Sequence, residues 1–149
     1  MSLLVIGYGN TLRCDDGVGP QVAESLAARN LPGVRAVACQ QLTPELAEAV
    51  AQAGAVVFVD AALDAGQVEW REVKAEDPPQ TPAHASNPRQ LLSLARQLFG
   101  RQPPAWVVAV PVEHLGMGES LSPRAAAGLQ TATAQIEKFA QSLGSKGFR

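Results

Sequence analysis

The residues best suited to chemistry in this chain of 149 residues are carboxylates that follow apolar stretches. Asp15 and Asp16 come soon after the apolar run 3–6, and Asp60 comes directly after the apolar run 55–59. Carboxylates can bind divalent cations or act as general bases. If the two runs are strands of one open α/β sheet, their carboxyl ends share an edge, so we expect these acids to converge on one crevice.

The acidic pair also has a simpler interpretation, because acids are favoured at a helix N-terminus. One acid is enough for that role, and two adjacent carboxylates repel each other. We therefore expect one of Asp15 and Asp16 to cap or brace the loop and the other to face the site. The nearby helix N-terminus favours an ionised carboxylate, which suits a metal ligand or a general base better than a general acid. Asp60 has a similar alternative role, that of a satisfied acid at the end of a strand.

His84 lies in a proline-rich segment, 75–88, that follows the strand ending on Asp60. A loop histidine is usually only solvated, and that alternative stays open. Together with two carboxylates, however, one imidazole makes a ligand set that suits a borderline divalent metal such as zinc or nickel, with open positions. We interpret the second histidine, His114, as a surface residue.

The segment Gly7-Tyr8-Gly9 has the first two glycines of a dinucleotide-binding loop. Leu12 replaces the third glycine of that motif, and Gln40 and Gln41 occupy the place where an acid would follow the second strand. Two carboxylates in the same loop would also repel a pyrophosphate. A nucleotide cofactor of the Rossmann type is therefore not expected.

Apolar periodicity predicts five strands and four helices in the order β-α-β-α-β-β-α-β-α. Only the segment 61–66 separates the third strand from the fourth, which is too short for a parallel crossover, so this pair should be antiparallel. Polar alternation places the fourth strand near an edge. The chain is thus expected to be one α/β domain, 1–149, a three-layer α/β/α sandwich around a five-stranded, mostly parallel sheet with one antiparallel strand. The strands are expected at 3–6, 34–39, 55–60, 67–73 and 105–110, and the helices at 18–29, 43–54, 87–100 and 122–144.

Composition narrows the choice of partners. Hydrophobic residues make up 46% and charged residues 17%, with a formal net charge of −2 and no basic run, so nucleic acid is not an expected partner. The sequence has no apolar stretch of membrane-spanning length and no signal-peptide pattern, so we expect a cytoplasmic protein without a membrane contact. Cys14 and Cys39 are too few for a disulfide framework or a thiolate zinc site. Cys39 is interpreted as a small buried hydrophobe, and a reactive role stays open for Cys14.

Four features in this order resemble the nickel–iron hydrogenase maturation endopeptidases, and the resemblance covers nearly the whole chain. They are the motif G-x-G-N-x4-D-D-G-x-G from Gly7 to Gly19, the apolar strand that ends in Asp60, the histidine His84 seven and eight residues before Leu91 and Leu92, and the segment 118–122 before the last helix.

This resemblance implies a soluble protease that removes the C-terminal extension of the hydrogenase large-subunit precursor after nickel has been inserted. It assigns metal binding and catalysis to Asp16, Asp60 and His84, with the nickel supplied by the precursor rather than permanently bound. Many relatives carry glutamate at the position of Asp16, so the shorter side chain here changes its reach. The resemblance does not decide whether the nickel polarises the scissile carbonyl or only licenses docking. In an alternative mechanism, Asp16 and Asp60 activate the water themselves as paired aspartates.

Two other functions are compatible with parts of this pattern. A non-enzymatic nickel-binding maturation chaperone would use the same three residues and leave the mass of its partner unchanged. A peptidyl-transfer-RNA hydrolase also begins its sheet with a glycine-asparagine loop, but the acidic pair and the lack of basic patches argue against it. The segments 75–87 and 111–121 are expected to contact the large subunit, and the oligomeric state is not predicted.

Overall fold

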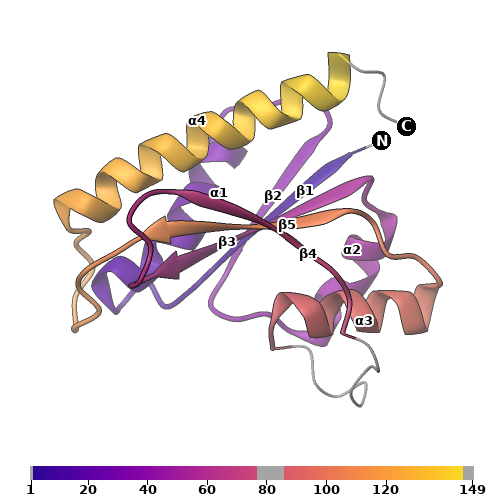
Figure 1. The fold of residues 1–149 in the computed structure, drawn as a ribbon, viewed down its shortest axis with the longest axis horizontal. Helices are drawn as coiled ribbons and strands as arrows, with labels where there is room; N and C mark the ends of the chain where they lie inside the picture. The colour runs from indigo at the N-terminus through magenta and orange to yellow at the C-terminus, as the bar shows by residue number, and fades with distance from the viewer. Residues whose placement is uncertain (1, 77–85, 146–149) are drawn as a thin grey trace.

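The computed structural model describes residues 2–76 and 86–145, which form a five-stranded sheet covered by helices on both faces (Figure 1). The strand order is β2-β1-β3-β5-β4. The strands are β1 (Leu3–Tyr8), β2 (Val34–Cys39), β3 (Ala55–Ala62), β4 (Glu69–Val73) and β5 (Ala105–Pro111). The helices are α1 (Val18–Ala28), α2 (Ala47–Gln52), α3 (Pro88–Phe99) and α4 (Pro123–Ser145), with the short 3-10 turns η1 (Cys14–Gly17) and η2 (Pro44–Leu46) before α1 and α2.

The sheet is parallel except for the edge strand β4, which runs antiparallel to β5, so the predicted fold class is confirmed. One detail of the prediction was wrong: β4 does not pair with β3, because β5 lies between them. The apolar β5 is buried by strands on both sides there, whereas the polar alternation of β4 suits an edge. In addition, β3 continues two residues past Asp60, where Ala61 pairs with Val110 and Ala62 with Pro111.

Two of the predicted helix starts are confirmed at atomic detail. The side chain of Asn87 accepts a hydrogen bond from the backbone N–H of Gln90, and Ser122 Oγ accepts one from Ala125. Thr43 lies at the predicted start of the second helix, and its side chain makes no capping hydrogen bond. The chain there forms the turn η2 before α2 begins.

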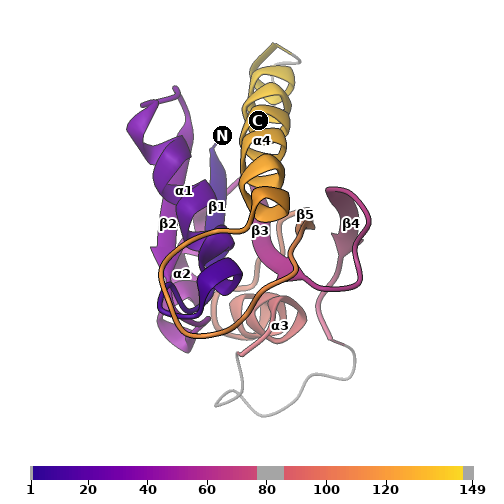
Figure 2. The ribbon, with the colours of Figure 1, turned by 90° about the vertical axis from the view of Figure 1, so that its left-hand side faces the viewer.

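Two hydrophobic cores separate the three layers. Alternate residues of β1 face opposite ways, so that Leu3 and Val5 pack with α1 and α4, while Leu4 and Ile6 pack with α2 and α3. Both views show α4 and α1 on one face of the sheet and α3 and α2 on the other (Figures 1 and 2). Within the described part of the chain, none of the helices is both long and apolar enough to span a bilayer.

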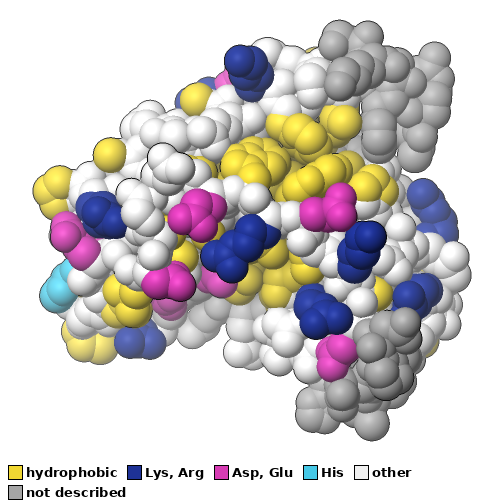
Figure 3. All heavy atoms as spheres, in the orientation of Figure 1, with side chains coloured by type: hydrophobic (Ala, Val, Ile, Leu, Met, Phe, Trp, Pro, Cys, Tyr) yellow, Lys and Arg dark blue, Asp and Glu magenta, His cyan; other side chains and the backbone are white. Residues whose placement is uncertain are grey.

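The edge strand β4 is attached to α4 by aromatic contacts. Phe139 of α4 lies 5.3 Å from the ring of Trp70 and 5.0 Å from that of Trp106, centroid to centroid. The indole N–H of Trp70 also donates a 2.7 Å hydrogen bond to Gln135. In Figure 3 hydrophobic side chains gather between α4 and β4, where this part of the core reaches the surface.

The glycines of the first motif let α1 lie close to the sheet. A Cβ atom at Gly19 would lie 2.6 Å from the carbonyl oxygens of both Tyr8 and Val59. A Cβ at Gly9, whose φ is +150°, would lie 2.0 Å from the carbonyl oxygen of Asp16. Only glycine fits such contacts. The motif therefore brings η1 and the start of α1 over the carboxyl ends of β1 and β3.

Candidate functional site

The candidate site is the edge of the sheet at which the parallel strands end. Figure 2 looks toward this edge and shows the segment between β5 and α4 crossing it to reach the loop that follows β1. Backbone hydrogen bonds join the two segments: Cys14 N–H donates to Gly118 O at 2.8 Å, and Gly118 N–H donates to Leu12 O at 2.9 Å. Loops that follow β1 and β5 are therefore held together as one surface.

Asp15 is the residue that braces these loops. Its side chain is completely buried and accepts four hydrogen bonds from the segment between β5 and α4. The donors are the backbone N–H groups of Glu113 and His114, both at 3.0 Å, and the N–H and hydroxyl of Ser122, at 2.7 and 2.6 Å. Burial raises the pKa of Asp15, but these bonds to the carboxylate outweigh burial, and the net pKa is lowered. One acid of the pair is thus a structural anchor with no free oxygen for a ligand.

Asp16, the other acid of the pair, is partly exposed at the same edge. Its Oδ2 accepts a 2.7 Å hydrogen bond from the backbone N–H of Asn10, which fixes the carboxylate beside the end of β1. Asp60 lies on β3, the neighbouring strand, and its Oδ2 accepts a 3.1 Å hydrogen bond from the Tyr8 hydroxyl. Asp16 and Asp60 therefore lie at the same edge of the sheet, but the hollow that Asp60 lines does not include Asp16.

The electrostatics of Asp60 are unusual for a carboxylate near the surface. Burial raises its pKa, and the negative charge of Asp16 raises it further, while hydrogen bonds from Tyr8 and the Ala61 backbone oppose the shift. Within residues 2–76 and 86–145, neither carboxylate forms an ion pair with a basic side chain. Two carboxylates at one edge, neither of them in an ion pair within the described residues, form a site that a cation or a proton would stabilise.

The predicted third ligand, His84, lies outside the described residues, and so does most of the proline-rich segment. At the start of this segment, Glu76 contacts α3: its N–H donates to Arg89 O at 3.2 Å, and its carbonyl oxygen accepts a hydrogen bond from Ser93 Oγ at 2.9 Å. Among the residues the structure does describe, no group of three His, Cys, Asp or Glu side chains could hold a metal ion. The described part of the candidate site is thus a carboxylate pair.

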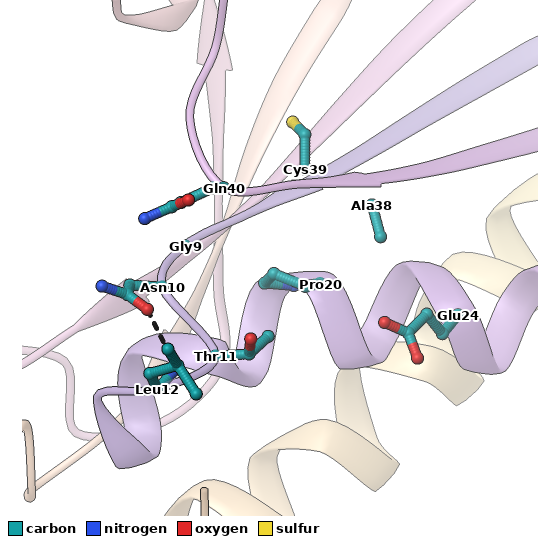
Figure 4. Close-up of a pocket in the computed structure, with 9 residues that line it drawn as sticks. All are labelled: Gly9, Asn10, Thr11, Leu12, Pro20, Glu24, Ala38, Cys39 and Gln40. Carbon is teal, nitrogen blue, oxygen red and sulfur yellow. Dashed lines mark hydrogen bonds between the residues drawn. The ribbon is translucent and has the colours of Figure 1, made fainter. Parts of the chain in front are cut away.

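Two hollows lie along this edge, and Asp60 lines one of them. One, of about 290 Å³, is bounded by the loop 9–12, α1 and the end of β2; Figure 4 shows Asn10, Gln40 and Glu24 around it. The other, of about 520 Å³, is lined by Asp60 and by residues of β4 and β5 such as Arg71. Small and medium-sized side chains at Ala109 and Val107 line it as well. A polypeptide that entered the second hollow would therefore contact Asp60.

Sequence reasoning did not single out Tyr8 as a site residue. The alternation of side chains along the strands could have identified it. Phe58 pairs with Ile6 and faces the same side of the sheet as Leu4, Ile6 and Tyr8. Tyr8 is therefore directed to the side of the sheet that Asp60 also faces. Cys14 is poorly placed for a reactive role, because its thiol is buried and donates to the carbonyl oxygen of Met117 at 3.6 Å.

Two remaining expectations concern exposure. His114 is exposed, as expected, and only its backbone contacts Asp15. Cys39 is only partly buried, at the end of β2, where burial raises the pKa of its thiol. It packs against the core on the α2 and α3 side, as expected of a small hydrophobe.

The fold and the edge define a class: an α/β/α sandwich with an acidic pair where its central strands end. No protein-family model matches the sequence, and no protein of curated function matches it. Solved structures do match. The NiFe hydrogenase maturation protease HycI from Thermococcus kodakarensis has a TM-score of 0.71 at 22% identity, over 94% of this chain and 92% of that one. The hydrogenase maturating endopeptidase HybD from E. coli has a TM-score of 0.71 at 22% identity, over 99% and 94%. HybD from T. kodakarensis, also a NiFe hydrogenase maturation protease, has a TM-score of 0.70 at 25% identity, over 94% and 99%.

The chain therefore has the fold of the hydrogenase maturation proteases, and the resemblance recognised from its motifs is confirmed at that level. A shared fold does not by itself establish an activity, because one fold can carry unrelated functions. The residues at the edge of the sheet must carry that argument.

Proposed function

We propose that this protein is an endopeptidase that removes the C-terminal extension of a nickel–iron hydrogenase large-subunit precursor. The observation that carries the proposal is the acidic pair: Asp16 and Asp60 lie at one edge of the sheet, and neither forms an ion pair with a basic side chain among the described residues. The fold shared with solved maturation proteases supports the same conclusion.

In this proposal, Asp16 and Asp60 recognise the nickel that the precursor already holds, and His84 is the third residue of the set. Two carboxylates and one imidazole suit a borderline divalent cation. A precursor that carries nickel supplies the positive charge that the acidic pair lacks. Recognition of this kind makes processing depend on prior nickel insertion, so that an immature precursor is not cut.

The chain's own groups have defined tasks in the cleavage step. Peptide hydrolysis needs a positioned water and stabilisation of the charge that develops on the carbonyl oxygen, and a bound divalent metal can supply both. Tyr8 and Asn10 hold one oxygen each of Asp60 and Asp16, so the remaining oxygens have fixed directions. The hollow that Asp60 lines would receive the polypeptide around the scissile bond.

The alternative mechanism, in which the two aspartates share a proton and activate water, has one observation in its favour. Burial is the main reason that the pKa of Asp60 is raised, and the charge of Asp16 adds to the shift in the direction expected for paired acids. This route does not depend on nickel. A precursor prepared without nickel therefore separates the two mechanisms.

The test is incubation of the purified protein with nickel-loaded and nickel-free precursor, followed by mass spectrometry of the precursor. The nickel-loaded precursor should become shorter at its C-terminus, and Asp60→Asn and Asp16→Asn should each slow this by about 100-fold or more. Glu48→Gln, an exposed acid on α2 that lines none of these hollows, is the matched control and should process normally.

Each outcome has a distinct meaning. Normal processing by both Asp16→Asn and Asp60→Asn would reject the proposed roles. Equal cleavage of the nickel-free precursor would reject nickel recognition and favour the paired aspartates. A precursor that binds without any change in mass would instead indicate the nickel-binding chaperone.

A further inference from the structure

Five large hydrophobic side chains are exposed in the described part of the chain, and their distribution is uneven. Three of them follow the carboxyl ends of three neighbouring parallel strands: Leu12 after β1, Leu63 after β3 and Met117 after β5. Their exposed fractions are 57%, 62% and 86%. The other two, Leu98 and Phe99, end α3 at the opposite edge of the sheet. Isolated exposed hydrophobes are ordinary on protein surfaces, so it is the shared location that needs an explanation.

The backbone that carries Leu12 and Met117 is firmly held. Arg13 and Gly118 form a β-bridge between the two loops, and the carbonyl oxygen of Leu12 accepts a hydrogen bond from Gly118. The buried carboxylate of Asp15 ties the same loops together from inside the protein. These two side chains are therefore presented to solvent by a fixed scaffold.

Each of the three side chains also lines its own hollow along this edge. Leu12 borders the hollow beside α1 and β2, and Leu63 borders the one that contains Asp60. Met117 borders a third, open hollow of about 640 Å³ between the loop after β5 and Cys14. Figure 3 shows hydrophobic side chains among charged ones at this end of the molecule. The surface around the acids is thus uneven and partly apolar, which suits contact with a protein surface.

We propose that Leu12, Leu63 and Met117 form an apolar docking surface around Asp16 and Asp60, and that it binds the nickel-bearing face of the large-subunit precursor. This inference rests on the proposed function and adds the contact surface to it. Charge complementarity selects the occupant, because the centre of the surface is a pair of carboxylates and neither forms an ion pair with a basic side chain within the described residues.

Apolar contacts around a charged centre also have a physical effect on it. They exclude water when the partner docks, and attraction between a carboxylate and a cation is stronger where water is excluded. A free metal ion in solution cannot make these contacts. Docking through the apolar surface would therefore favour nickel that is held in a protein over nickel in solution.

The test replaces each hydrophobe with glutamine, which keeps the size of the side chain and adds no charge. Leu12→Gln, Leu63→Gln and Met117→Gln should each raise KM for the nickel-loaded precursor about five- to tenfold with kcat unchanged, and the triple variant at least about fiftyfold. Leu98→Gln is the matched control, since Leu98 is 58% exposed at the opposite edge, and its KM should equal that of the wild type. Thermal melts establish that all variants are folded.

Failure of the docking surface and failure of the proposed function give different results. If the wild type shortens the precursor and the triple variant does so with the same KM, the docking surface is wrong and the protease remains. If the wild type binds the precursor without shortening it, the protease is wrong, and the docking surface is judged by the same variants through their Kd. If the wild type neither binds nor shortens the precursor, both are overturned.

Discussion

Replacing Asp15 by asparagine tests the structural half of the acidic pair. The side chain keeps its shape, but one of its two oxygens becomes an NH2 group. If the remaining oxygen takes the position of Oδ2, it can still accept from Glu113, His114 and the Ser122 hydroxyl. The backbone N–H of Ser122 lies 2.7 Å from Oδ1 in the wild type. In the variant this N–H would face the new NH2 group, which is also a hydrogen-bond donor.

The cost follows from the bonds that are lost. A hydrogen bond to a charged group contributes about 1.5–3 kcal/mol, and a buried donor without a partner costs about 1–3 kcal/mol. We therefore expect Asp15→Asn to lower the free energy of unfolding by about 3 kcal/mol at pH 7. A chain of this size would then melt about 6–12 °C lower. Asp15→Ala leaves all four donors without their acceptor and should cost about 5 kcal/mol.

Urea unfolding followed by tryptophan fluorescence measures this effect, and its pH dependence tests the cause. The pKa of Asp15 is lowered in the folded protein. The contribution of the ionised side chain to the free energy of unfolding is therefore complete above the pKa of the unfolded chain, about 3.9. It is lost as the pH falls through the lower pKa of the folded protein. The difference between wild type and Asp15→Asn should thus be constant from about pH 5 to 8 and shrink below about pH 4.

The matched control is Asp64→Asn, which changes an exposed acid and should alter stability by less than about 0.5 kcal/mol. A loss of less than about 1 kcal/mol for Asp15→Asn at pH 7, or a difference that persists unchanged in acid, would refute the assignment of Asp15 as an ionised anchor.

Two further predictions concern Gly19 of the first motif and Asp60 of β3. Gly19→Ala should lower the free energy of unfolding by about 2 kcal/mol or more, because its Cβ would lie 2.6 Å from two carbonyl oxygens. Gly66→Ala, with no atom within 4 Å of the added Cβ, should change it by less than about 0.5 kcal/mol, and equal urea midpoints for the two variants would contradict this account. Asp60→Asn should raise the urea midpoint at pH 7, because a raised pKa means that the ionised carboxylate lowers stability above the unfolded value of about 3.9. The gain should disappear near pH 3, and a variant less stable than the wild type at pH 7 would show that Asp60 is a stabilising group instead.

The strands and most helix boundaries could be predicted from the sequence because their signals are local. Continuous apolar runs mark β1, β3 and β5 as buried strands, and alternation marks β4 as an edge strand. Asn87, Ser122 and Gly100 mark helix ends through hydrogen bonds or a left-handed backbone that involve only a few neighbouring residues. Parallel strands end at one edge, so the meeting of Asp16 and Asp60 also follows from the order of the elements.

Tertiary structure alone decided which acid does what. Asp15 and Asp16 are adjacent and chemically identical in sequence, and they differ only because the segment between β5 and α4, about a hundred residues later, encloses the first and leaves the second partly exposed. The insertion of β5 between β3 and β4 and the bond from Tyr8 to Asp60 likewise depend on contacts between distant segments. A local pattern determines which residues form an element and which face they occupy. The groups that contact a buried charge are decided by the tertiary structure, because they come from segments that are distant in the sequence.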